Sequence, residues 1–220
     1  RTYLPSIFPV IAVTATLLQK GRHSIIAVGG IALMIVILGI GTYQRNLIWQ
    51  TDLALWRDCV RKSPEKAGPY NNLGTAYDRQ GNYRRAILNH QAALAIRQKR
   101  SGPDHPDTAA SYNNLGGTYR KAGNYANAID CHQKALDIRQ RVLGHCHLLT
   151  AESYNNLGIA YKYQGDYAKA VENYKKALAI TLARSGPRHP NAAVIHHNLN
   201  NICGGLSPVL PTAGPRPNIR

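Results

Sequence analysis

Tyr-Asn-Asn-Leu-Gly at Tyr70–Gly74 is the stretch that organises this chain. The same five residues return at Tyr112–Gly116 and at Tyr154–Gly158, each copy 42 residues after the previous one. One further step of 42 reaches the related His-His-Asn-Leu of His196–Leu199. A constant period of tens of residues indicates units that stack on copies of themselves. The sequence therefore predicts a repeat protein with a partial fourth copy.

Apolar residues within a copy have the spacing of two successive helices. In the first copy they occur at i, i+3 and i+7, and then again at i, i+7 and i+8. These residues are Tyr70, Leu73 and Tyr77, followed by Ala86, Ala93 and Leu94. Gly81-Asn82 between them supplies a turn. A hairpin that is apolar on both broad faces must stack on its neighbours, so the expected fold is an all-α superhelical solenoid whose concave surface is lined by first helices.

Each copy resembles a tetratricopeptide repeat (TPR) unit. Nine residues recur at the offsets of that pattern, in the first copy Tyr70, Leu73, Gly74, Tyr77, Gly81, Tyr83, Ala86, Ala93 and Leu94. The period of 42 and linkers such as Ser101–Asp107 (Ser-Gly-Pro-Asp-His-Pro-Asp) resemble TPR units of the kinesin-light-chain type. Within a TPR domain at 64–203, the expected repeats are about 67–100, 109–142 and 151–184, with a half-repeat at 191–203.

The asparagines of the motif are the candidate functional residues. The resemblance to the TPR superhelices of O-GlcNAc transferase and kinesin light chain implies a ladder of asparagines that binds an extended peptide. An amide side chain both donates and accepts hydrogen bonds, so it can hold a peptide backbone whatever its sequence. Basic neighbours would favour an acidic ligand. The predicted groove residues are Asn71, Asn72, Asn113, Asn114, Asn155, Asn156, Asn198, Arg79, Lys121 and Lys162. The alternative is that the asparagines serve folding or capping.

The N-terminal residues 1–45 predict a membrane region. Residues 24–44 carry no charge, and as a helix they would be about 31 Å long, close to the thickness of the hydrocarbon core. Residues 3–19 predict a second, shorter span. The alternatives are a buried core helix for the first segment and a cleaved signal peptide for the second. The chain is therefore expected to be an integral membrane protein that contacts the lipid bilayer.

Two further segments flank the solenoid. Trp49, Leu53, Trp56 and Val60 have the spacing of one helix face, and Pro64 ends that helix, so residues 46–63 predict a junction helix that caps the repeats. The Gly- and Pro-rich residues 204–220 predict a disordered tail.

The side of the membrane on which the repeats lie has two opposing indications. Arg1, Arg45 and other basic residues near the membrane favour a cytoplasmic location. Residues 1–74 resemble the C-terminal end of the polytopic, TPR-tailed O-mannosyltransferases, which implies an extracytoplasmic one. That resemblance, in a chain that starts without methionine, gives an alternative function: the C-terminal part of a membrane glycosyltransferase whose catalytic part lies elsewhere.

No catalytic motif and no cofactor site are predicted within these residues. His145-Cys146-His147 has the residue types of a metal site, but His147 is in register with His105 and His189, so we interpret it as part of the repeat. The net charge of +16 has no arginine-rich run beside it, which argues against nucleic acid as a partner. The leading hypothesis is a membrane-anchored, non-catalytic scaffold that binds a protein or peptide in its groove.

Overall fold

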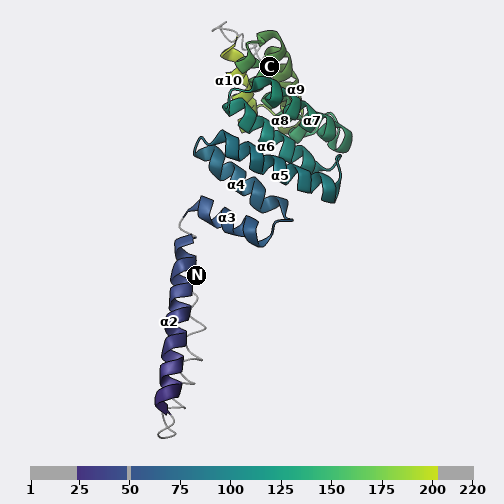
Figure 1. Ribbon diagram of the computed structural model, residues 1–220. Helices are drawn as coiled ribbons and strands as arrows, with labels where there is room; N and C mark the ends of the chain where they lie inside the picture. Colours follow the sequence, from purple (N-terminus) through teal and green to yellow (C-terminus); the bar gives the residue numbers. More distant parts are fainter. Residues whose placement is uncertain (1–23, 49–50, 203–220) are drawn as a thin grey trace, which may run out of the picture. The chain divides into compact units, whose positions relative to one another are not determined.

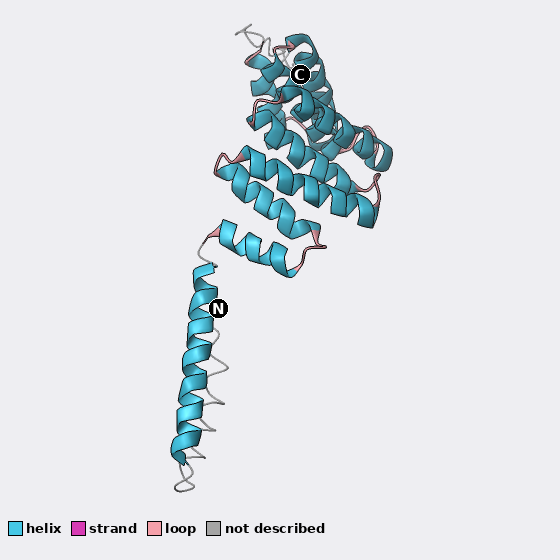
Figure 2. Cartoon of the chain, viewed as in Figure 1, coloured by secondary structure: helices cyan, strands magenta, loops and turns pink. Residues whose placement is uncertain are grey.

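The computed structural model describes residues 24–48 and 51–202, and within these ranges it contains helices and no strand (Figure 1, Figure 2). The expected span at 3–19 and the tail at 204–220 lie outside the described residues. The chain divides into two units, Arg1–Asp58 and Cys59–Arg220. The helices are α2 (Ser24–Ile48), α3 (Asp52–Lys62), α4 (Ala67–Arg79), α5 (Tyr83–Ser101), α6 (Pro106–Lys121), α7 (Tyr125–Leu143), α8 (Leu148–Gln164), α9 (Tyr167–Ser185) and α10 (Pro190–Asn200).

Helix α2 contains the whole of the apolar segment 24–44. Its side chains are described from 29 to 44, and the large apolar ones among them are exposed, as Leu33 (61%) and Leu38 (58%) illustrate. Among the residues that the structure describes, no helix combines the length and the hydropathy of a membrane span.

The junction helix begins later than the sequence suggested. α2 continues to Ile48, and α3 starts at Asp52 rather than at residue 46. Thr51 is the N-cap that places the start of α3 at Asp52. Its hydroxyl accepts a hydrogen bond from the backbone N–H of Ala54 (3.3 Å). Leu53 and the other apolar residues of this helix are half-buried, and none is fully buried.

Residues 67–200 form the predicted solenoid. Three hairpins (α4–α5, α6–α7 and α8–α9) and the single helix α10 follow one another, and each helix packs against the next along the chain (Figure 1). The expected turn is present in each hairpin: Gly81, Gly123 and Gly165 have φ of 73°, 78° and 92°, a region that glycine adopts without strain.

The first helices of the later repeats start earlier than the pattern indicated, at Pro106 and Leu148 instead of 109 and 151. A histidine in each linker acts as the N-cap. Nδ1 of His105 accepts from the backbone N–H of Asp107 (3.1 Å), and Nδ1 of His147 accepts from Leu149 (3.1 Å). His189 caps α10 in the same way. In α6 and α8 the cap thus adds three residues, most of a turn, to the expected helix.

The two helices of each hairpin approach closely at the motif glycine. A Cβ added to Gly74 would lie 2.8 Å from the ring of His90, and one added to Gly116 would lie 2.8 Å from the ring of His132. In the third repeat the same contact is made by Gly158 and Tyr174, at 2.7 Å. The glycine of the motif thus leaves space for a ring from the second helix of its own hairpin.

Candidate functional site

The motif asparagines pair with one another across successive repeats. Nδ2 of the second asparagine in one copy donates to Oδ1 of the first asparagine in the preceding copy. The pairs and their distances are Asn114 to Asn71 (2.8 Å), Asn156 to Asn113 (2.8 Å) and Asn198 to Asn155 (3.2 Å). The first helices α4, α6, α8 and α10 are thereby linked along one surface by a row of half-buried amides.

This pairing uses only part of each amide. An asparagine carries two N–H groups and an oxygen with two lone pairs, and one of these is taken at each end of a pair. The second asparagine of a copy keeps its oxygen and one N–H. In the part of the chain that the structure describes, the first asparagines Asn71 and Asn155 keep their amide nitrogen, whereas Asn113 donates one of its two N–H groups to Glu152 (3.1 Å). The surface therefore retains donors and acceptors in a regular row.

A pocket of about 250 Å³ opens on this surface between the first and second repeats. It is lined by residues from α4 to α8. They are Thr75, Asp78, His90, Asn113, Asn114, Gly117, Thr118, Arg120, Lys121, His132 and Asn156. The structure thus brings three of the predicted asparagines and Lys121 together in one pocket.

The other predicted groove residues have different positions. Asn71, Asn155 and Asn198 belong to the paired row, and Asn72 is half-buried on α4. Arg79 and Lys162 do not line this pocket. The pattern of the sequence could not distinguish Arg79 from Lys121, because the two residues are 42 apart and so occupy the same position in successive repeats.

Charges of both signs meet in the pocket. Nζ of Lys121 forms an ion pair with Oδ2 of Asp78, and the carboxylate side chain of Asp78 is only 12% exposed. The guanidinium of Arg120 lies 5.5 Å from the ring centre of Tyr163, which is a cation–π arrangement. With two cations and one carboxylate, the pocket carries a net positive charge.

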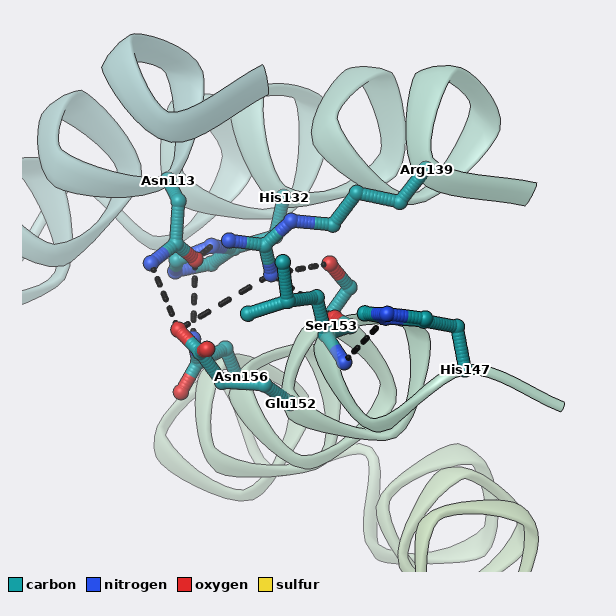
Figure 3. A network of polar contacts seen from close by, with 8 residues as sticks. Asn113, His132, Arg139, His147, Glu152, Ser153 and Asn156 are labelled. Carbon is teal, nitrogen blue, oxygen red and sulfur yellow. Dashed lines mark hydrogen bonds and ion pairs between the residues drawn. The ribbon is translucent and has the colours of Figure 1, made fainter. Parts of the chain in front are cut away.

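Two histidines line the pocket, and neither was singled out from the sequence. Nδ1 of His132 is 3.2 Å from Oδ1 of Asn113, so this ring is connected to the asparagine row (Figure 3). Burial, with Arg120 and Arg139 nearby, lowers the pKa of His132 to about 4, and burial also lowers the pKa of His90. Both rings are therefore neutral at pH 7. The sequence did contain a signal for these two residues, because His90 and His132 are separated by the repeat period of 42.

An arginine fixes the second repeat to the third next to this row. Arg139 of α7 is 5% exposed, and its Nη1 donates to the backbone oxygen of Leu149 (2.8 Å) and to Oγ of Ser153 (2.9 Å). Its guanidinium is also 3.8 Å from the carboxylate of Glu152, which accepts a hydrogen bond from Nδ2 of Asn113 (3.1 Å) (Figure 3). These contacts hold the asparagines at a fixed spacing.

The His-Cys-His cluster has a structural function for one member, since Nδ1 of His147 caps α8. In residues 24–48 and 51–202 no group of three or more metal-ligating side chains is close enough to hold an ion.

The hairpins, their inter-repeat asparagine row and their ring-on-glycine packing define a helical repeat protein of the TPR class. The family model for the tetratricopeptide repeat matches residues 65–126 and 107–183, which is more than half of the chain. The chain belongs to the tetratricopeptide repeat family.

Two curated relatives from Drosophila melanogaster are similar over short regions. Protein O-mannosyl-transferase Tmtc3 is 33% identical over 66 residues, which are 30% of this chain and 7% of that protein. Protein O-mannosyl-transferase Tmtc1 is 33% identical over 76 residues, which are 34% of this chain and 9% of that protein. The chain therefore matches less than a tenth of the length of either relative.

Solved structures share the fold. BtubC (BKLC) from P. vanneervenii has a TM-score of 0.63 at 23% identity, covering 92% of this chain and 84% of that one. A putative kinesin light chain of Podospora anserina with nearly identical TPR-like repeats has a TM-score of 0.60 at 22% identity, covering 75% and 82%. The predicted similarity to kinesin-light-chain repeats is thus confirmed at the level of the fold.

Proposed function

We propose that this chain is a non-catalytic scaffold whose concave groove binds an extended segment of a partner protein. The observation that carries the proposal is the pocket in which Asn113, Asn114 and Asn156 converge from two adjacent first helices. Their unpaired amide groups match the alternating N–H and C=O groups of a peptide backbone. TPR domains generally bind proteins, which supports the same class of ligand.

The charge of the groove favours an acidic segment. Arg120 and Lys121 line the pocket with a single carboxylate, Asp78, and the chain as a whole has a net charge of +16. Attraction between exposed charges weakens as salt screens them. Binding of an acidic segment should therefore weaken when ionic strength is raised, whereas binding through amides alone should not.

The test uses pools of nine-residue peptides with degenerate sequences, retained on the immobilised full chain. Replacement of both Asn114 and Asn156 by alanine should reduce retention about thirtyfold, since each change removes hydrogen bonds of roughly 1 kcal/mol. Asn127→Ala is the matched control, because Asn127 is exposed on the second helix α7, away from the pocket lining. Equal retention by all three proteins would contradict the proposal.

We further propose that α2 anchors the solenoid to a membrane. The supports are the uncharged segment 24–44 and the exposed side chains of Leu33, Ile35 and Ile37, which water solvates poorly. Extraction of membranes with alkaline carbonate should leave the full chain in the membrane fraction. The same extraction should release a variant that carries both Ile35→Lys and Ile37→Lys. Release of both proteins alike would contradict anchoring by α2.

The alternative function is the non-catalytic C-terminal part of an O-mannosyl-transferase-like protein. Its specific support is the similarity to Tmtc3 and Tmtc1. The two functions differ in what precedes Arg1 in the transcript: further spans with an acidic first loop support the transferase, whereas a nearby start codon supports a simple scaffold. Protease accessibility in sealed vesicles then determines the side, which is extracytoplasmic under the transferase alternative.

A further inference from the structure

The pocket between the first and second repeats contains two buried polar atoms that lack hydrogen bonds. Among the described residues, no partner lies within hydrogen-bond reach of Oδ1 of Asp78 or of Nδ1 of His90. Both residues line the pocket, and His90 is 3% exposed. Since a buried polar group without a partner is costly, two such atoms in one pocket are candidates for hydrogen bonds to a ligand.

Among the repeats, only the first combines an aspartate with a histidine at the corresponding positions. Residue 78 is aspartate, but one and two repeats later the position holds Arg120 and Lys162. In the second repeat Nδ1 of His132 has a contact with Asn113, which His90 does not make with Asn71. The hydroxyl of Tyr174, at the position of His90 two repeats later, also lacks a partner among the described residues, but it has no aspartate beside it, because the position of Asp78 holds Lys162 there.

The geometry and charge of the pocket select the chemical class of the ligand group. A cation would be repelled by Lys121 and Arg120, and a carboxylate has no proton to donate to Oδ1 of Asp78. The group is therefore neutral. It must donate to the carboxylate oxygen of Asp78, which only accepts, and it must also satisfy a neutral imidazole nitrogen, which donates in one tautomer and accepts in the other.

A primary carboxamide meets these conditions in either tautomer. One N–H can reach Asp78, and either the second N–H or the oxygen can reach His90. A hydroxyl has a single proton and would satisfy only the tautomer in which His90 donates. The pocket volume of about 250 Å³ is far larger than the ~30 Å³ share of one water molecule, so a side chain can enter.

We propose that this pocket receives the carboxamide of an asparagine or glutamine side chain from the bound segment, with Oδ1 of Asp78 and Nδ1 of His90 as its hydrogen-bond partners. This inference rests on the proposed function, because the carboxamide belongs to the segment that the groove holds. It fixes the register in which the segment binds, since one of its side chains must occupy the pocket between the first and second repeats.

The test measures retention of positional pools of nine-residue peptides on the full chain. In each pool one position is fixed as Gln, Asn, Leu, Glu or Lys, and the others are degenerate. At one position, pools with Gln or Asn should be retained about tenfold better than the pool with Leu, because Leu leaves both atoms unpaired. The preference should disappear in Asp78→Leu and in His90→Tyr.

His90→Tyr introduces the residue that the third repeat carries at this position, Tyr174, so it keeps the packing while changing the polar group. Tyr174→His is the matched control, because it makes the reverse change outside the pocket and should keep the preference. Retention without a carboxamide preference at any position, or a preference that persists in both pocket variants, would overturn this inference while leaving the proposed function intact. Retention of no pool would contradict both.

Discussion

Asn156 of α8 and Asn113 of α6 are joined by a hydrogen bond of 2.8 Å from Nδ2 to Oδ1, across the boundary between two repeats. The same bond occurs one repeat earlier, between Asn114 and Asn71. The residues proposed to hold a peptide thus also hold the solenoid together. A single substitution at these positions changes both stability and binding, and the two effects have to be separated.

A double-mutant cycle separates them for the Asn156–Asn113 pair. Each single change to alanine should lower the free energy of unfolding by about 1 kcal/mol, and the double variant should lose less than the sum, with a coupling of about 0.5–1 kcal/mol. Urea unfolding followed by circular dichroism measures these values. Strict additivity would show that this hydrogen bond adds nothing to stability.

At the motif glycines, a change to alanine should destabilise the chain although alanine is the better helix former. Gly158→Ala should destabilise the chain by about 1–3 kcal/mol, because the added Cβ would lie 2.7 Å from the ring of Tyr174, which is fully buried. Alanine is otherwise the better helix former by about 1 kcal/mol.

Gly117→Ala is the control for this prediction. Gly117 lies in the interior of α6, and an added Cβ there meets no atom within 4 Å. The substitution should raise the thermal midpoint, whereas Gly158→Ala should lower it. A rise in both variants would mean that Tyr174 moves aside at little cost.

The stacking of the repeats could be predicted from the sequence, but the polar contacts between them could not. The spacing of Tyr70, Leu73 and Tyr77 reports which face of a helix is apolar, and this is sufficient for helices and their order. Whether Asn114 meets Asn71 or a ligand depends on how two helices cross and on side-chain rotamers, which periodicity does not contain. The pairing of asparagines therefore became visible only in the structure.

Stability should depend on pH through His132. Burial lowers the pKa of its ring to about 4, whereas an ordinary histidine in the unfolded chain has a pKa of about 6.5. Between these values the unfolded chain binds a proton that the folded chain excludes, so stability is fully present above about pH 6.5 and falls as the pH decreases towards 4. The loss attributable to this group is at most about 3 kcal/mol.

His132→Tyr tests this prediction, since tyrosine occupies the equivalent position in the third repeat. Thermal midpoints measured from pH 7 to pH 4 should fall less steeply in the variant. A part of the slope should remain, because burial also lowers the pKa of His90. Identical slopes for the two proteins would assign the acid sensitivity to other groups.

Arg139 should be among the most sensitive positions of the solenoid. Its buried guanidinium satisfies the backbone oxygen of Leu149 and the hydroxyl of Ser153, and Arg139→Ala would leave both without this donor. The expected loss is about 3 kcal/mol. Arg97 makes the equivalent bonds to Asp107 and Ser111 but is half-buried, so Arg97→Ala should cost less.

At the interface between α9 and α10, an apolar contact takes the place of the arginine–serine contact. Thr181 and Ile195 occupy there the positions of Arg139 and Ser153, and both are buried. Because Ile195 needs no hydrogen-bond partner, the pair Arg139→Thr with Ser153→Ile should recover part of the stability lost in Arg139→Thr alone. The midpoints of urea unfolding of the single and double variants measure this recovery. A double variant less stable than the single one would show that the guanidinium is required for its contact with Leu149 rather than for Ser153.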